Sequence, residues 1–118
     1  MHEVSLMQNL LDIVSKTVER EGGTKANLIH LRLGELSGVN KDALRFAFDV
    51  LSKGTVADGA KFEIEDVPLR VQCADCGEEF SPEELTFRCE NCGSTNIEIT
   101  SGREMEIDYI LMDDENEG

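Results

Sequence analysis

The sequence predicts an α+β fold in which two helices pack on a small three-stranded sheet, and a small module with all four cysteines is inserted into this domain. Two segments carry apolar residues at helical spacing, and three carry them at alternating positions. The cysteines lie between the second and the third alternating segments. A chain of 118 residues has room for one small domain and a module too small to bury a core of its own.

The segment from Val4 to Val18 is predicted to form an amphipathic helix. Ser5 is its expected N-cap, because a serine side chain can accept a hydrogen bond from an amide of the first turn. The Gly22-Gly23 pair is the expected stop, since glycine readily takes the left-handed conformation that ends helices. The apolar residues of this stripe are Val4, Met7, Leu10, Leu11, Ile13, Val14 and Val18.

The next segment alternates in polarity and is predicted to be a strand. Ile29, Leu31 and Leu33 fall on one face, which we expect to be buried. His30 falls on the opposite face, where we interpret it as an ordinary polar residue.

A second helix is predicted after Asn40, whose side chain can cap its first turn. Gly54 is expected to close this helix. The apolar residues at helical spacing in this segment are Ala43, Leu44, Ala47, Phe48 and Leu51.

Two further strands are predicted on either side of the cysteines. Phe62 and Ile64 alternate with charged residues before them, and Met105, Ile107 and Tyr109 do so after them. We expect the last strand to rejoin the sheet of the first domain, so the cysteine module is an insertion. The predicted parts are an α/β domain over residues 1–69 and 98–112, the inserted module over residues 70–97, and a disordered acidic tail over residues 113–118.

The cysteines form two Cys-x-x-Cys pairs, Cys73 with Cys76 and Cys89 with Cys92, separated by twelve residues. Each pair is followed by a glycine, which can take a positive φ and turn the chain so that amide hydrogens point toward the thiolates. Two such turns facing each other place four sulfurs tetrahedrally, which suits Zn(II). The spacing therefore predicts a structural Zn(II) site in a zinc-ribbon-like module that is held by metal binding more than by hydrophobic burial.

Two other uses of the cysteines stay open at this stage. Disulfides or a redox dithiol would suit an oxidising compartment, but no basic segment followed by an apolar run at the N-terminus directs the chain there, so we expect a cytoplasmic protein. A rubredoxin-like iron site would also use four thiolates. Its expected aromatic shell is thin here, because only Phe80 and Phe87 lie nearby.

The charge of the chain argues against nucleic acid as a partner. The formal net charge is −14, and residues 68–93 contain only Arg70 and Arg88 against six acidic side chains. No apolar run approaches the length of a membrane span. We also expect no enzyme, because a closed cage of four thiolates has no free coordination position and the sequence suggests no nucleophile-base pair.

Met1, His2 and Glu3 offer a second set of metal ligands. The amine of Met1, the imidazole and backbone nitrogens of His2 and the backbone nitrogen of Glu3 can supply four roughly coplanar nitrogen donors. Such a set suits Ni(II) or Cu(II) and fits Zn(II) or Mg(II) badly. Local chemistry alone leaves open whether His2 is an ordinary surface residue. It also leaves open whether the Glu3 carboxylate adds an oxygen ligand or only charges the start of the helix.

Several segments together resemble the HypA/HybF family of nickel metallochaperones. They are Met1-His2-Glu3, the start of the first helix from Ser5 to Leu11, Leu33 to Val39, Ala43 to Phe48, both Cys-x-x-Cys pairs, and Ser101 to Met105. Double Cys-x-x-Cys pairs occur in many families, but these segments in this order are specific and cover nearly the whole chain.

The resemblance implies a non-catalytic protein that binds Ni(II) reversibly and delivers it to the large subunit of [NiFe]-hydrogenase, in some relatives also to urease. It maps the nickel ligands onto Met1, His2 and Glu3 in the first domain, and the zinc ligands onto the four cysteines. It also implies a HypB-type GTPase as a partner. Asn40 stands where some relatives carry an acidic residue near the nickel site.

An open sheet edge also allows a homodimer. The alternative function is a zinc-ribbon protein-interaction module without nickel transfer, which explains the cysteines but not the three N-terminal residues.

Overall fold

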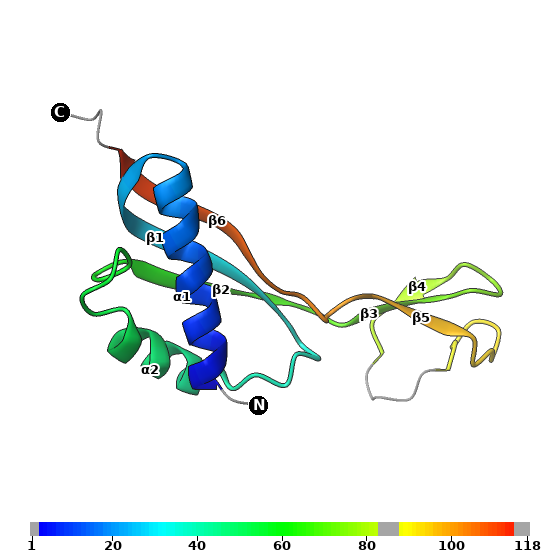
Figure 1. Cartoon of the computed structure of the whole chain (residues 1–118). Helices are drawn as coiled ribbons and strands as arrows, with labels where there is room; N and C mark the ends of the chain where they lie inside the picture. Colours follow the sequence, from blue (N-terminus) through cyan, green and yellow to red (C-terminus); the bar gives the residue numbers. More distant parts are fainter. Residues whose placement is uncertain (1–2, 83–87, 115–118) are drawn as a thin grey trace. The chain divides into compact units, whose positions relative to one another are not determined.

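The computed structural model describes residues 3–82 and 88–114, and the chain divides into two compact units (Figure 1). Unit one contains the helices and most of the sheet that they cover, and unit two contains the cysteines. Unit one comprises Met1–Leu31, Gly38–Glu65 and Glu106–Gly118, and unit two comprises Arg32–Ser37 and Asp66–Met105.

The first helix, α1, spans Glu3–Arg20. The prediction that Ser5 caps it is wrong, because the helix already includes Glu3 and Ser5 is exposed within its first turn. The carboxylate of Glu3 favours this start, since negative charge is stabilising at a helix N-terminus. Gly22 ends the helical segment with a φ of 75°, as predicted. The buried face consists of Leu6, Met7, Leu10, Leu11, Val14 and Val18. Most of the predicted stripe is therefore confirmed, but Val4 and Ile13 are exposed, and Leu6 is buried although the prediction did not include it.

A three-stranded sheet, as predicted, consists of β1 (Gly23–Gly34), β2 (Lys61–Val67) and β6 (Met105–Asp114) in the order β2-β1-β6. The alternation predicted for β1 is confirmed, because Ile29, Leu31 and Leu33 are buried. Strand β6 includes the first two residues of the expected acidic tail, and residues 115–118 lie outside the described part of the chain.

The alternation predicted for β6 is wrong after Ile107. Ile107, Ile110 and Met112 pack against the core, whereas Tyr109 is 45% exposed. A spacing of three between Ile107 and Ile110 cannot belong to a strict two-residue alternation, so the facing of the side chains changes phase between them. Tyr109 consequently faces away from the core and stacks on His30.

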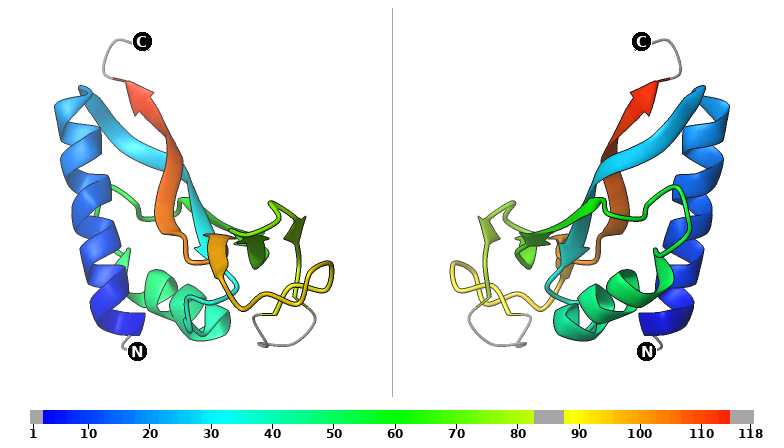
Figure 2. Two further views of the ribbon diagram at one scale, coloured as in Figure 1. Left: turned by 90° about the vertical axis from the view of Figure 1, so that its right-hand side faces the viewer. Right: turned by 90° about the vertical axis from the view of Figure 1, so that its left-hand side faces the viewer.

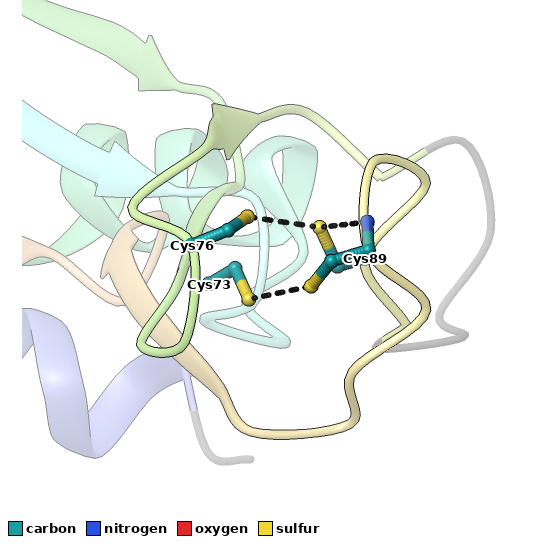
Figure 3. A group of neighbouring side chains, drawn as sticks. Cys73, Cys76 and Cys89 are labelled. Carbon is teal, nitrogen blue, oxygen red and sulfur yellow. Dashed lines mark hydrogen bonds between the residues drawn. The ribbon is translucent and has the colours of Figure 1, made fainter.

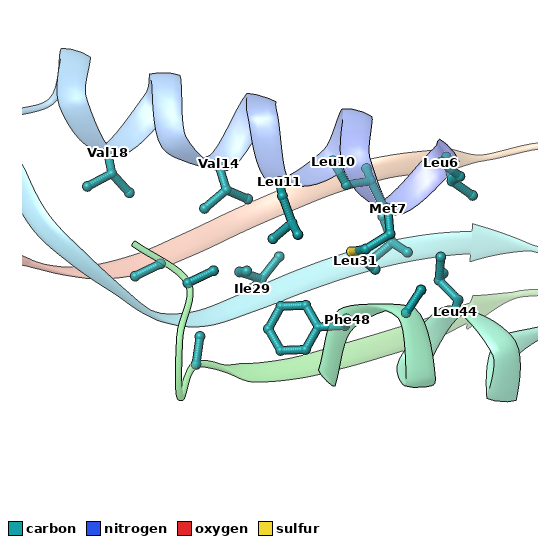
Figure 4. Close-up of a cluster of buried hydrophobic side chains, with 14 residues drawn as sticks. Leu6, Met7, Leu10, Leu11, Val14, Val18, Ile29, Leu31, Leu44 and Phe48 are labelled. Carbon is teal, nitrogen blue, oxygen red and sulfur yellow. The ribbon is translucent and has the colours of Figure 1, made fainter. Parts of the chain in front are cut away.

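The second helix, α2, spans Lys41–Leu51, and its N-cap is Asn40, as predicted. The Asn40 side chain accepts a hydrogen bond from the backbone N–H of Ala43 at 2.9 Å. Both helices lie against the same face of the β2-β1-β6 sheet (Figure 2). Side chains of α1 meet Ile29 and Leu31 of β1 and Phe48 of α2 in one core (Figure 4). No helix in residues 3–82 and 88–114 is long and apolar enough to cross a membrane.

Asn40→Ala is expected to lower the free energy of unfolding of unit one by about 1 kcal/mol, because it removes the side-chain acceptor for an amide of the first turn. Asn40→Asp is the matched control, since a carboxylate accepts the same hydrogen bond and should keep the stability nearly unchanged. Thermal unfolding followed by far-ultraviolet circular dichroism measures both variants. Equal losses in the two would contradict the capping role.

Unit two contains a second three-stranded sheet, which the sequence did not predict. It consists of β3 (Arg70–Cys73), β4 (Glu79–Phe80) and β5 (Ile97–Ser101) in the order β4-β3-β5. Both neighbours of β3 are antiparallel to it, with Val71 opposite Phe80 on one side and opposite Ile99 on the other. The sheet places Cys73 at the end of β3, where the first cysteine turn begins.

Three segments of unit two are joined closely where Gly34 meets Gly102. The N–H of Gly34 donates to the carbonyl of Glu104 at 2.6 Å, and the N–H of Leu36 donates to the carbonyl of Gly102 at 2.7 Å. The third segment joins through Leu69, whose N–H donates to the Glu35 carboxylate at 2.7 Å. These bonds tie residues 32–37, 66–70 and 101–105 together.

Candidate metal centre

The two cysteine turns have the same backbone geometry. The N–H of Gly77 donates to the carbonyl of Cys73 at 2.8 Å, and the N–H of Gly93 donates to the carbonyl of Cys89 at 2.8 Å. Gly77 has a φ of 80° and Gly93 a φ of 76°, values that side chains with a Cβ rarely adopt. The glycine after each pair therefore closes its turn, as the sequence predicts.

The four sulfur atoms lie in one cluster (Figure 3). The Sγ atoms of Cys73 and Cys92 are 3.6 Å apart, as are those of Cys76 and Cys89, and all four lie within 4.8 Å of one another. These separations exceed a disulfide bond of about 2.05 Å. Sulfurs bound at about 2.3 Å to a tetrahedral zinc ion lie roughly 3.8 Å apart. The predicted ligand set thus has the spacing of a tetrahedral thiolate site and is compatible with zinc.

The surroundings of the Cys76 and Cys92 sulfurs shift their pKa values in opposite directions. The Asn91 amide, 3.6 Å from the Cys76 sulfur, and then the backbone N–H of Glu78 lower the pKa of Cys76 to about 7. The backbone N–H of Ser94 lowers the pKa of Cys92, but the neighbouring sulfur of Cys73, burial and the other thiols outweigh it and raise that pKa to about 12. The cluster therefore stabilises the thiolate form of Cys76 but disfavours four thiolates without a counter-charge. A bound dication offsets the repulsion between the thiolates.

Polar side chains that the sequence reasoning missed connect the two turns. The Asp75 carboxylate accepts hydrogen bonds from the hydroxyl of Ser94 and, at 3.5 Å, from the amide of Asn96. The backbone N–H of Ala74 donates to the carbonyl of Asn96 at 2.9 Å. These residues hold the first turn against the chain that follows the second. Their polarity close to each Cys-x-x-Cys pair is the signal that could have identified them.

Few apolar side chains are buried around the cluster, as expected. Among the described residues from 72 to 100, only Cys73 and Cys89 are fully buried, and Phe80 is half-buried. Phe87, the other aromatic residue predicted near the cysteines, lies outside the described residues. Burial alone therefore stabilises this segment weakly, and a bound metal ion is the natural source of additional stability.

Of the predicted nickel ligands, Met1 and His2 lie outside the described residues, and Glu3 begins α1. The Glu3 carboxylate accepts a hydrogen bond from the backbone N–H of Asn40 at 3.2 Å. The start of α1 therefore lies beside the cap of α2. Glu3 uses one carboxylate oxygen in this contact, while Asn40 uses its own side chain to cap α2.

This chain is similar to known proteins over nearly its whole length. A family model described as "Hydrogenase/urease nickel incorporation, metallochaperone, hypA" matches residues 1–112. The hydrogenase maturation factor HypA of Roseiflexus sp. (strain RS-1) is 41% identical over 116 residues, which cover 98% of this chain and 94% of the relative. HypA of Chlorobium luteolum is 39% identical over 117 residues, which cover 99% of this chain and 100% of the relative.

Two solved structures share the fold of this chain. The solution structure of the Ni metallochaperone HypA from Helicobacter pylori superposes with a TM-score of 0.71 at 29% identity, covering 98% of this chain and 100% of that one. A second solution structure, of a HypA protein, gives a TM-score of 0.74 at 29% identity and covers 95% of this chain and 96% of that one. The similarity therefore includes both the helical unit and the cysteine-containing unit.

Proposed function

Because the chain belongs to the HypA family of hydrogenase maturation factors, we propose that it carries Ni(II) at its N-terminus and delivers the ion to the large subunit of [NiFe]-hydrogenase. The observation that carries the proposal is the family match from residue 1 to residue 112, which includes the Met1-His2-Glu3 sequence at its start. The chain works as a carrier in the cytoplasm, not as an enzyme, and its partner is a HypB-type GTPase.

The proposed nickel site uses the Met1 amine, the imidazole and backbone nitrogens of His2, and the Glu3 backbone nitrogen. Four nitrogen donors in one plane suit Ni(II). Glu3 is the first residue of α1, and amides of a first turn do not donate within their own helix, so coordination there leaves the helical hydrogen bonds intact. A terminal chelate can also be removed stepwise by incoming ligands, which suits release to a recipient.

The second part of the proposal is a structural Zn(II) ion bound by Cys73, Cys76, Cys89 and Cys92. Four thiolates fill a tetrahedral zinc shell and leave no open position. This centre therefore holds the cysteine turns in place, while the reversible exchange of cargo takes place at the N-terminus.

His2→Ala is expected to abolish the binding of Ni(II) by the untagged, zinc-loaded protein, because it removes one of the four nitrogen donors. A short peptide without histidine fused before Met1 should do the same, since it converts the amine into an amide. Isothermal titration calorimetry, together with the absorption band of square-planar Ni(II), measures the loss, and metal analysis checks that zinc stays bound.

Position 3 offers a matched pair of variants for this test. Glu3→Pro removes the backbone N–H and so the fourth nitrogen donor, while the first position of a helix tolerates proline. Glu3→Gln keeps that nitrogen and should bind nickel normally. Normal nickel binding by His2→Ala would refute the N-terminal assignment, and a wild-type protein without nickel affinity would favour a zinc-ribbon interaction module.

A further inference from the structure

We propose that His30, Glu65 and Asp108 form a second metal site, which binds a divalent first-row transition metal ion on the face of the β2-β1-β6 sheet opposite the core. The three residues come from the three strands of the sheet, β1, β2 and β6 respectively. One ligand atom from each lies within 4.8 Å of the other two. The site uses none of the cysteines and none of Met1, His2 and Glu3, and it does not depend on the proposed function.

The spacing of the three side chains fits a small ion. His30 Nε2 lies 2.8 Å from Oε1 of Glu65. Donor atoms at about 2.1 Å from a six-coordinate ion lie roughly 3 to 4.2 Å apart, so small side-chain adjustments would place the three donors around one ion. One imidazole nitrogen with carboxylate oxygens suits ions such as Co(II), Ni(II), Zn(II) and Mn(II), with water completing the shell. The two carboxylates carry the charge that a dication neutralises.

Glu63 contacts the second nitrogen of the His30 imidazole ring, Nδ1. Its Oε1 atom lies 3.2 Å from His30 Nδ1, and its Oε2 atom lies 3.5 Å from the Lys61 ammonium. A histidine that binds a metal through one nitrogen commonly donates its other N–H to a carboxylate, which fixes the tautomer and the ring orientation. Glu63 is therefore a positioning residue, and Nε2 is the nitrogen that is directed at the ion.

The Tyr109 ring packs against the face of the His30 imidazole ring. The two rings stack with centroids 4.8 Å apart and an interplanar angle of 5°. This stack follows from the change of phase in β6, which turns Tyr109 away from the core. Because the chain contains one tyrosine and no tryptophan, the fluorescence of Tyr109 reports directly on the ring beside it.

An ion can reach these side chains from solvent. His30, Glu63 and Glu65 line an open hollow of about 470 Å³, and Asp108 is exposed. The structural alternative is a protonated His30 that only links β1 to β2. Hydrogen bonds to Glu65 and then Glu63 raise the pKa of His30, and a bound ion would take the place of the proton between His30 and Glu65.

The test uses the full, zinc-loaded chain with His2→Ala and a short histidine-free peptide before Met1, so that the N-terminal nitrogens are not available. Co(II) is the probe, because a paramagnetic ion at His30 quenches the fluorescence of Tyr109. The expected result is saturable quenching at one Co(II) per chain with an equal stoichiometry by calorimetry. The strong absorption of cobalt bound to thiolates should be absent, and Mg(II) should give no quenching.

Three variants distinguish Co(II) binding at the proposed site from non-specific attraction of the ion to an acidic protein. Glu65→Gln and Asp108→Asn should each weaken Co(II) binding at least about tenfold. A loss of about tenfold in metal affinity is the smallest that is typical when even a residue that only supports a metal ligand is replaced. Glu98→Gln on β5 removes the same charge from an exposed strand position and should leave the affinity unchanged. Equal affinity in all three variants, or no saturable quenching in the parent chain, would overturn the proposal.

Glu63 has its own matched pair. Glu63→Ala should weaken Co(II) binding by about 10- to 100-fold without changing the stoichiometry. Glu63→Gln should recover part of this loss, because its amide oxygen still accepts a hydrogen bond from Nδ1–H. A Glu63→Ala variant that binds Co(II) as tightly as the parent chain would remove Glu63 from the site and leave the three direct ligands to be judged by their own variants.

Discussion

Cys92→Ala is expected to release zinc and unfold the cysteine turns, while unit one stays folded. Cys92 is exposed, and substitution of an exposed residue by alanine ordinarily changes stability by no more than about 0.5 kcal/mol. Structural zinc contributes about 10 to 16 kcal/mol in small domains that are held by metal. The two cysteine turns have little buried apolar surface to replace that contribution.

Hydrogen exchange gives a direct measure of this effect. The amides of Gly77 and Gly93 donate to carbonyls inside the two turns, so their protection should disappear in Cys92→Ala and in chelator-treated wild type. Amides of β1 in unit one should stay protected, because the hydrophobic cluster that packs on β1 consists of residues of that unit. Metal analysis should show the loss of zinc in parallel.

Asn91→Ala is the matched control for the loss of a ligand. It removes the hydrogen bond to the Cys76 sulfur and keeps all four thiolates. We expect a loss of about 10- to 100-fold in zinc affinity and turns that stay folded when zinc is present. Zinc-free Cys92→Ala with protected Gly77 and Gly93 amides would show that the turns fold without metal.

Gly34→Ala is expected to destabilise unit two by about 4 kcal/mol or more, which is exceptional for a single substitution. A Cβ atom on Gly34 would lie 2.1 Å from the carbonyl oxygen of Gly102 and 2.7 Å from the backbone nitrogen of Arg103. Both contacts are with backbone, so a side-chain rotation cannot relieve them. The segments around Gly34 and Gly102 must separate and lose the hydrogen bonds that join them.

Gly38→Ala separates this steric effect from the cost of an unusual backbone angle. Gly38 has a φ of 72°, but no heavy atom lies within 4 Å of the position of an added Cβ. Its substitution should cost only about 1 to 2 kcal/mol, the strain of a left-handed conformation. Urea unfolding, with exchange of the Leu36 amide as a local probe, measures both variants. Similar losses for Gly34→Ala and Gly38→Ala would contradict the steric argument.

The sequence predicts well the features that depend on near neighbours. The stripe of α1 and the alternation of β1 repeat over a few residues, and the Asn40 cap joins groups three residues apart. The clustering of the four cysteines was predictable because two Cys-x-x-Cys turns that face each other bring their sulfurs together. Ser5 shows the limit of this reasoning, since a suitable capping residue does not cap when the helix includes an earlier residue.

Contacts between distant segments were not predictable from local patterns. The sequence could identify Gly34 only as a turn residue, whereas its close approach to Gly102 depends on how three segments meet. The hydrogen bond from Asn91 to the Cys76 sulfur likewise needs the two turns to face each other.

The helices and strands of unit one, the core-facing side of β1 and the residues of the cysteine cluster were therefore predictable, because local periodicity and side-chain chemistry specify them. The surroundings of His30 depend instead on contacts between strands that are distant in the sequence. Its carboxylate partners in β2 are 33 and 35 residues away, and Tyr109 reaches it through the change of phase in β6. Local patterns do not specify such contacts, because strand register and the facing of each side chain are set by pairing across the sheet.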